Sequence, residues 1–150
     1  TLFISKNLVK VNASLRPKSL RKEASKHGRN IIVFEGGESL RFDEEGIQEG
    51  INGTFRVLDF LQMQKRNVVP AKPPVVCQKT SWVRAKVAGL FRGQIALGDY
   101  IQKGQYIGSI ADPYGQMSVK IKSLKAGYVI GLNRMPVVNQ GDALLHLGLL

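Results

Sequence analysis

The sequence predicts an α/β segment followed by a small all-β segment, and three features of its patterning indicate this division. In residues 1–63, strand-like and helix-like stretches alternate along the chain. In residues 80–150, short apolar stretches are separated by glycine turns, a rhythm that is typical of an all-β unit. Residues 64–79 hold three of the six prolines, so we expect them to form an extended linker between the two segments.

The first segment begins with a strand candidate at residues 8–11, and a helix is expected after it. Pro17 can open this helix, because its missing N–H costs nothing in a first turn, and Gly28 can end it. Residues 31–34 form an apolar, β-branched run. This run predicts a strand that is buried on both faces, as in a parallel or mixed sheet.

A second helix is predicted from Asp43, because acidic residues follow it in the first turn, where the helix dipole favours them. Glycines recur along this helix at the spacing of its apolar residues, which predicts close packing against a sheet. The apolar face consists of Ile47, Ile51, Phe55 and Leu58, and the glycines are Gly46, Gly50 and Gly53.

The net charge of +11 raises the question of a nucleic-acid partner. Residues 1–34 hold eight basic residues and one acid, whereas residues 35–50 hold six acids and one arginine. The remaining basic residues are thinly spread, with no Arg-Gly repeat. We therefore expect solvated basic faces and no nucleic-acid partner. The alternative, a nucleic-acid binder, would show a steep dependence of binding on salt.

Cys77 is the one cysteine, which excludes an intramolecular disulfide and a cysteine-rich metal cluster. No apolar run approaches the roughly 18–20 residues needed to cross a bilayer. A cytoplasmic protein with no membrane partner is therefore expected, and a homo-oligomer is left open. The chain begins with Thr1 in place of Met, as expected of a piece of a longer protein.

A faint repeat divides residues 80–150 into two similar halves. Gly89 leads to a Gly98-Asp99 pair, and Gly127 leads to a Gly141-Asp142 pair. Two halves of about 35 residues each predict a small barrel or sandwich with pseudo-twofold symmetry.

Residues 98–108 resemble the turn of barrel-sandwich hybrid domains, which include biotinyl and lipoyl carriers. In such a turn the glycines take positive-φ positions, and Asp99 can bond neighbouring backbone N–H groups. Ile101 and Ile107 are expected to point into the core.

The same resemblance leaves a non-enzymatic binding or carrier module as an alternative function. A carrier would need a modifiable lysine at a hairpin tip, and Lys122 and Lys125 are available. Neither lies in a Met-Lys-Met or Asp-Lys-Ala motif. Mass spectrometry for biotin or lipoate on these lysines would identify a carrier.

Residues 12–147 resemble the succinylglutamate desuccinylase/aspartoacylase family of zinc hydrolases more closely. The most specific matches are the Asp112-Pro113-Tyr114-Gly115 turn and the Asn139-Gln140-Gly141-Asp142-Ala143 ending. Upstream, the run that ends in Glu35-Gly36-Gly37 resembles the family's strand ending in Glu-x-Gly. Residues 14–16 resemble its Ser/Thr-Leu-Arg turn.

The resemblance implies the C-terminal piece of a zinc-carboxypeptidase-like α/β domain, followed by a small β barrel-sandwich domain. The implied activity is a deacylase that cleaves the amide or ester bond of a small, anionic N-acyl amino acid. In the family, zinc activates a water and a strand-end glutamate takes its proton. By position that catalytic glutamate is Glu35, and Glu38 is the competitor. Arg16 is the candidate for contacting a substrate carboxylate.

The family's zinc ligands, a His-x-x-Glu pair and a later His, have no counterpart in this sequence. The two histidines are His27, expected at a helix end on the surface, and His146, expected to be structural. Cys77 has no histidine near it in sequence, so it is not expected to be a nucleophile. We therefore expect zinc ligands upstream of this chain, which by itself should be inactive.

Overall fold

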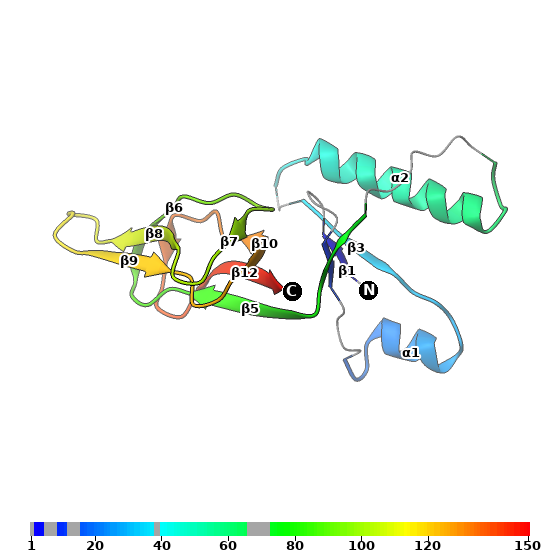
Figure 1. The fold of residues 1–150 in the computed structure, drawn as a ribbon, viewed down its shortest axis with the longest axis horizontal. Coiled ribbons are helices and arrows are strands. Elements are labelled where there is room, and N and C mark those ends of the chain that lie inside the picture. The colour runs from blue at the N-terminus through cyan, green and yellow to red at the C-terminus, as the bar shows by residue number, and fades with distance from the viewer. Residues whose placement is uncertain (1, 5–8, 12–15, 38–39, 66–72) are drawn as a thin grey trace. The chain divides into compact units, whose positions relative to one another are not determined.

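The chain divides into two units, Thr1–Val76 and Cys77–Leu150. The computed structural model describes residues 2–4, 9–11, 16–37, 40–65 and 73–150, and Figure 1 labels most of their helices and strands. Among these residues, no helix is both long enough and apolar enough to span a membrane.

A four-stranded sheet with the order β3-β1-β2-β4 forms the centre of the first unit. Strand β1 (Leu2–Ile4) pairs antiparallel with β2 (Val9–Val11) and parallel with β3 (Val33–Glu35), so the sheet is mixed, as predicted. Strand β4 (Val75–Cys77) completes it. The expectation that the strand at residues 31–34 is buried on both faces is wrong. β3 is an edge strand of only three residues, and its side chains are half-buried or exposed.

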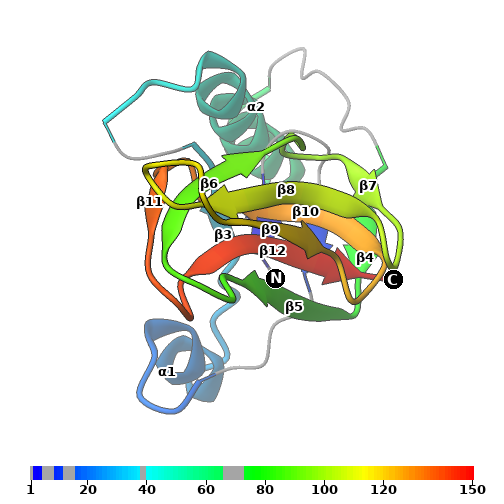
Figure 2. The ribbon, with the colours of Figure 1, turned by 90° about the vertical axis from the view of Figure 1, so that its left-hand side faces the viewer.

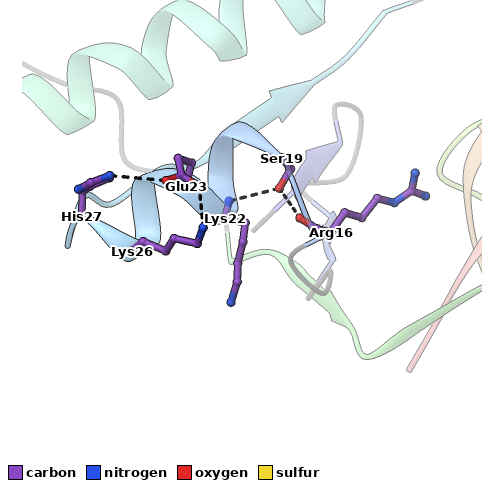
Figure 3. A network of polar contacts seen from close by, with 6 residues as sticks. All are labelled: Arg16, Ser19, Lys22, Glu23, Lys26 and His27. Atoms are coloured by element: carbon purple, nitrogen blue, oxygen red, sulfur yellow. Dashed lines mark hydrogen bonds and ion pairs between the residues drawn. The ribbon is translucent and has the colours of Figure 1, made fainter.

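Helix α1 (Leu20–Lys26) begins later than predicted, with Ser19 as its N-cap. The side chain of Ser19 accepts a hydrogen bond from the backbone N–H of Lys22 at 3.2 Å (Figure 3). Pro17 does not open the helix, because Lys18 has a φ of +59°, which interrupts right-handed helical geometry.

The end of α1 confirms the predicted glycine cap. Gly28 has a φ of +66°, which glycine adopts without steric cost. Its N–H donates to the carbonyl of Ser25, and the N–H of Arg29 donates to the carbonyl of Ala24. These two bonds form a Schellman motif, which satisfies carbonyls that the end of the helix leaves open.

Helix α2 (Glu44–Phe60) begins as predicted, with Asp43 as its N-cap accepting from the N–H of Gly46 at 3.2 Å. The predicted close packing is present at Gly50, where an added Cβ would lie 3.2 Å from the Phe34 ring of β3. The apolar face is only partly covered, since Ile47 and Ile51 keep 42% and 45% of their surface exposed.

The second unit consists of two four-stranded sheets with the orders β5-β12-β10-β7 and β11-β6-β8-β9 (Figure 2). All the recorded strand pairs in these two sheets are antiparallel. The strands are β5 (Lys79–Arg84), β6 (Gly89–Gly93), β7 (Tyr100–Ile101), β8 (Tyr106–Ala111), β9 (Ser118–Lys122), β10 (Gly127–Leu132), β11 (Val137–Val138) and β12 (Ala143–Leu149).

Both sheets contribute to one apolar core. Ile101 and Ile107 are fully buried, as predicted, and Asp99 accepts a hydrogen bond from the N–H of Ala96 at 2.7 Å. The other members of the core come from β6, from β8 to β12, and from the residue directly after β5: Phe91, Ile110, Ile121, Val129, Val138, Leu144, Leu145, Leu147 and Ala85.

The two sheets have equivalent strand orders, in agreement with the expected repeat. The long strand β6 lies between β11 and β8, and its equivalent β10 lies between β7 and β12. The first half holds β5 to β8 and the second half holds β9 to β12, so each short strand pairs with a long strand of the other half. This exchange means that neither half can bury its apolar residues without the other.

The predicted register of the repeat, however, is wrong, because Gly141 is equivalent to Gly104 and not to Gly98. The N–H of Gly104 donates to Ser123 O at 2.7 Å, and the N–H of Gly141 donates to Ala85 O at 2.9 Å. Both glycines have a positive φ, +84° and +90°. The similar Gly-Asp pairs are misleading, since Gly98-Asp99 precedes a short strand and Gly141-Asp142 precedes a long one.

The segment predicted as a linker, residues 64–79, is only partly described. Residues 66–72, which include Pro70, lie outside the described part of the chain. Strand β4 and the first residue of β5 fall inside this segment, so its end is paired rather than merely extended.

We predict that Gly148→Ala destabilises the second unit. An added Cβ would lie 2.5 Å from Cys77 Sγ and 3.2 Å from Ile130 Cγ2, so the core would be overpacked. Such changes typically cost about 1–3 kcal/mol of unfolding free energy. Urea unfolding followed by the fluorescence of Trp82, the single tryptophan, measures the loss. Cys77→Ala in the same chain should recover part of it. A double variant less stable than Gly148→Ala would contradict this packing.

We also predict that residues 77–150 fold without the first unit, because their core and turns come from this segment alone. A fragment of these residues should give a dispersed amide spectrum by NMR. Collapse of its amide signals to random-coil positions would show that the first unit is needed.

Candidate functional site

Glu35 occupies the end of β3, where its backbone is in register with Ile4 of β1. Its side chain is exposed, so water can reach the carboxylate. The chain then turns through Gly36 and Gly37, whose φ of +83° favours glycine. An added Cβ on Gly37 would lie 3.7 Å from Cβ of Asp43, so the loop returns close to the start of α2. The competitor, Glu38, lies outside the described residues.

Arg16 lies in the turn before α1, and its backbone holds that turn. Its carbonyl accepts from the Ser19 hydroxyl at 2.8 Å and from the Ser19 N–H at 3.3 Å. The side chain is exposed and points away from these contacts (Figure 3). In the described part of the chain, no hydrogen bond or ion pair joins Arg16 to Glu35. The two predicted site residues therefore remain separate candidates.

His27 is the C-cap of α1 and lies on the surface, as predicted. Its Nε2 is 3.6 Å from Glu23 Oε1, and Lys26 Nζ lies 2.9 Å from the other oxygen of the same carboxylate (Figure 3). These contacts are exposed and contribute little to stability. They place His27 in an exposed polar cluster at the end of the helix.

His146 is a packing residue of β12. It faces Trp82 across the β5–β12 pair, and the two rings stack with centroids 3.8 Å apart and planes 5° from parallel. Its Nε2 is buried and has no hydrogen-bond partner among the described residues. Burial lowers the pKa of His146, because the charged imidazolium would lose its hydration. These features agree with the structural role predicted for this residue.

Acidic, histidine and cysteine side chains are the usual ligands of zinc. Within the described ranges, no three of them lie close enough to hold a metal ion. The residues present there do not fit a zinc site. Cys77 is fully buried, and burial raises the pKa of its thiol, which disfavours the reactive thiolate.

A pocket of about 120 Å³ in the second unit was not foreseen from the sequence. It lies beside the end of β5 and the turn that follows β9, with buried Leu147 of β12 also in its wall. Its rim carries four cations and two large apolar side chains: Arg84, Lys86, Lys122, Lys125, Trp82 and Leu124. The lysines were visible in the sequence only as carrier candidates, because nothing local indicates that β5 lies beside them.

Comparison with known proteins gives matches at the level of structure. No protein-family model matches the sequence, and no curated protein matches it. The apo structure of the ectoine utilization protein EutE (DoeB) from Ruegeria pomeroyi superposes with a TM-score of 0.76 at 19% identity. The match covers 95% of this chain and 46% of that one. The chain has the fold of the C-terminal portion of this protein.

Two further solved structures also superpose on this chain. A succinylglutamate desuccinylase from Silicibacter matches with a TM-score of 0.70 and 18% identity, over 94% of this chain and 44% of that one. A succinylglutamate desuccinylase/aspartoacylase from Rhodobacter sphaeroides matches with a TM-score of 0.64 and 20% identity, over 83% and 41%. The chain therefore spans less than half the length of these proteins, and the likeness establishes a shared fold.

The His146 environment predicts a pH-dependent stability. Because burial lowers the pKa of His146 in the folded state, the unfolded chain binds its proton more readily. The free energy of unfolding should therefore fall as pH drops below about 6.5, the ordinary value for histidine. Urea unfolding between pH 7.5 and 5.5, followed by Trp82 fluorescence, measures this.

His146→Phe is the matched control, since it keeps an aromatic ring against Trp82 and removes the titrating group. Its stability should vary less with pH over the same range. An equal loss of stability in the two proteins would assign the pH dependence to another group.

Proposed function

We propose that the chain is the C-terminal portion of a zinc-dependent hydrolase of the succinylglutamate desuccinylase/aspartoacylase type. The reaction is cleavage of the amide, or ester, bond of a small, anionic N-acyl amino acid. The observation that carries this proposal is the fold match over 95% of the chain, found independently of the motifs that resemble the family. The second unit is then the barrel-sandwich domain that residues 98–108 resemble.

Glu35 is the proposed general base. It lies at the end of a strand, it is exposed, and a glycine-containing loop follows it, which leaves room for a substrate to approach closely. A carboxylate within one hydrogen bond of the attacking water can accept its proton and then pass that proton to the leaving amine. Arg16 is the proposed contact for the substrate carboxylate, because a guanidinium binds carboxylates with two parallel hydrogen bonds.

The exposed apolar residues of the first unit support a further part of the α/β domain. Large apolar side chains on the surface of a folded unit commonly mark a surface that another element covers. In the part of the first unit that is described, most of them lie on β3 or next to it, on the loop after it, and on and after α2: Ile32, Phe34, Leu40, Phe42, Ile47, Ile51, Val57, Phe60, Leu61 and Met63. Leu20 of α1 and Val76 of β4 are exposed as well.

Zinc is the proposed cofactor of the whole enzyme, and its ligands would have to come from outside the described residues. We predict that the 150-residue chain, after loading and dialysis, retains no stoichiometric zinc. Elemental analysis measures the zinc content per chain. One zinc per chain would mean that the described residues and their neighbours hold a site of their own, and would overturn the placement of the ligands upstream.

The role of Glu35 is tested in the complete enzyme by Glu35→Gln, which keeps the size of the side chain and removes its basicity. General acid–base catalysis typically contributes about 10²–10⁴-fold, so kcat should fall by at least about 10². KM should change far less, because the carboxylate acts on water. The zinc content should stay the same, because Glu35 is not proposed as a ligand.

Glu38→Gln is the control in the same assay and should lower kcat much less. Near-normal kcat in Glu35→Gln, or loss of zinc from it, would show that the role assigned to Glu35 is wrong. A large loss in Glu38→Gln alone would move the role to Glu38.

A further inference from the structure

The basic pocket lies where the two halves of the second unit meet. The turns after β5 and after β9 are equivalent in the two halves, as their backbone hydrogen bonds show. The N–H of Ala85 donates to Asp142 O at 2.8 Å, and the N–H of Ser123 donates to Gln105 O at 2.9 Å. Ala85 directly follows β5 and Ser123 directly follows β9, so the last residues of the two strands, Arg84 and Lys122, occupy equivalent places. Both residues line the pocket.

The pocket concentrates positive charge without a counterion of its own. Arg84 Nη1 donates to the carbonyl of Gly141 at 2.8 Å, which fixes the guanidinium at the rim. Lys86, Lys122 and Lys125 are exposed, and no carboxylate is among the residues that line the pocket. Four cationic residues around one pocket raise the local potential, which attracts an anion.

The three acidic residues of the second unit lie in turns, where their carboxylates accept hydrogen bonds from backbone N–H groups. Asp99 accepts from Ala96 at 2.7 Å, and Asp142 accepts from Asn139 at 2.7 Å. Asp112 accepts from the N–H groups of Gln116, Met117 and Tyr114, and these bonds outweigh desolvation and lower the pKa of its carboxyl. Residues 77–150 hold nine basic residues against these three acids, so the excess charge of the unit is positive.

The apolar side of the pocket can take a group of limited size. Trp82 and Leu124 line it and keep 51% and 75% of their surface exposed, while the lining residues Ile121 and Leu147 are buried. The volume is about 120 Å³. An enclosed cavity of about 150 Å³ holds a benzene molecule, so this smaller pocket, which is open to solvent, takes a ring in part or a short aliphatic chain and is too small for a whole drug-sized ligand.

We infer that this pocket binds a small organic anion, with an apolar group of about benzene size against Trp82 and Leu124 and a phosphate or carboxylate among Arg84, Lys86, Lys122 and Lys125. The apolar group supplies burial, and the charged group supplies attraction and orientation. The inference does not rest on the hydrolase proposal, because every lining residue belongs to Cys77–Leu150.

Titration of the full chain with phenyl phosphate tests this inference, followed by the fluorescence of Trp82 and by amide shifts in NMR spectra. We expect saturable binding with a dissociation constant of about 1 mM or below. Inorganic phosphate, which lacks the ring, and benzyl alcohol, which lacks the charge, should each bind at least about 5-fold more weakly. Benzoate carries a carboxylate on the same ring, so its affinity compared with that of phenyl phosphate shows which anion type the pocket prefers.

The matched variants are Lys122→Gln with Lys125→Gln, and Lys79→Gln with Arg92→Gln. Each pair removes two positive charges from exposed side chains of the second unit, but only the first pair lines the pocket. The first pair should weaken phenyl phosphate binding by about 5–10-fold, as expected for two exposed ion pairs, and the second pair should change it by less than about 2-fold. Dispersed amide spectra verify that both variants fold.

Three results would overturn the inference. If benzyl alcohol bound as tightly as phenyl phosphate, the pocket would be an apolar surface with no preference for an anion. If inorganic phosphate bound as tightly, the binding would be an attraction between charges with no role for the apolar side. Equal weakening by the two variant pairs would show that net charge, and not this pocket, attracts the anion. Shifts confined to Trp82, Leu124 and their neighbours, together with loss of affinity in the first pair alone, would support it.

Discussion

The exchange of short strands between the two halves of residues 77–150 is the constraint on which the second unit depends. Strand β7 pairs with β10, and β11 pairs with β6, so each half completes the sheet of the other. The core residues Ile101 and Val138 lie on these short strands and are almost fully buried. Because each half leaves its apolar face open without the other, the two must fold together to remove that surface from water.

This exchange also creates the surface that carries the basic pocket. The paired turns at Gly104 and Gly141 bond to Ser123 and Ala85, the residues that directly follow β9 and β5. The ends of these strands, which lie far apart in the sequence, therefore line one pocket. Its cations come from both halves, so the site is a product of the repeat rather than of any local motif.

The first unit is organised differently, around an edge strand and one helix. Phe34 of β3 packs against Gly50 of α2, and this contact helps to place the loop that follows Glu35. Much of the apolar surface on both elements stays exposed. The unit thus presents a candidate catalytic carboxylate on a scaffold with uncovered apolar residues, which is why its proposed chemistry depends on residues beyond those described.

Local signals in the sequence determined several turns, the end of α1 and the start of α2, but not the start of α1. Gly28 and Asp99 act as predicted, and α2 begins after Asp43 as predicted, because a left-handed φ, a turn bond and the first turn of a helix each depend on a few neighbouring residues. The division into α/β and all-β parts, and the strand end at Glu35, also follow from local apolar patterns. Tertiary structure alone decided the register of the repeat, the exposure of β3, the stacking of Trp82 on His146 and the gathering of four cations. Each of these depends on which strands pair across long stretches of chain, and that choice is made by burial of the whole core rather than by neighbouring residues.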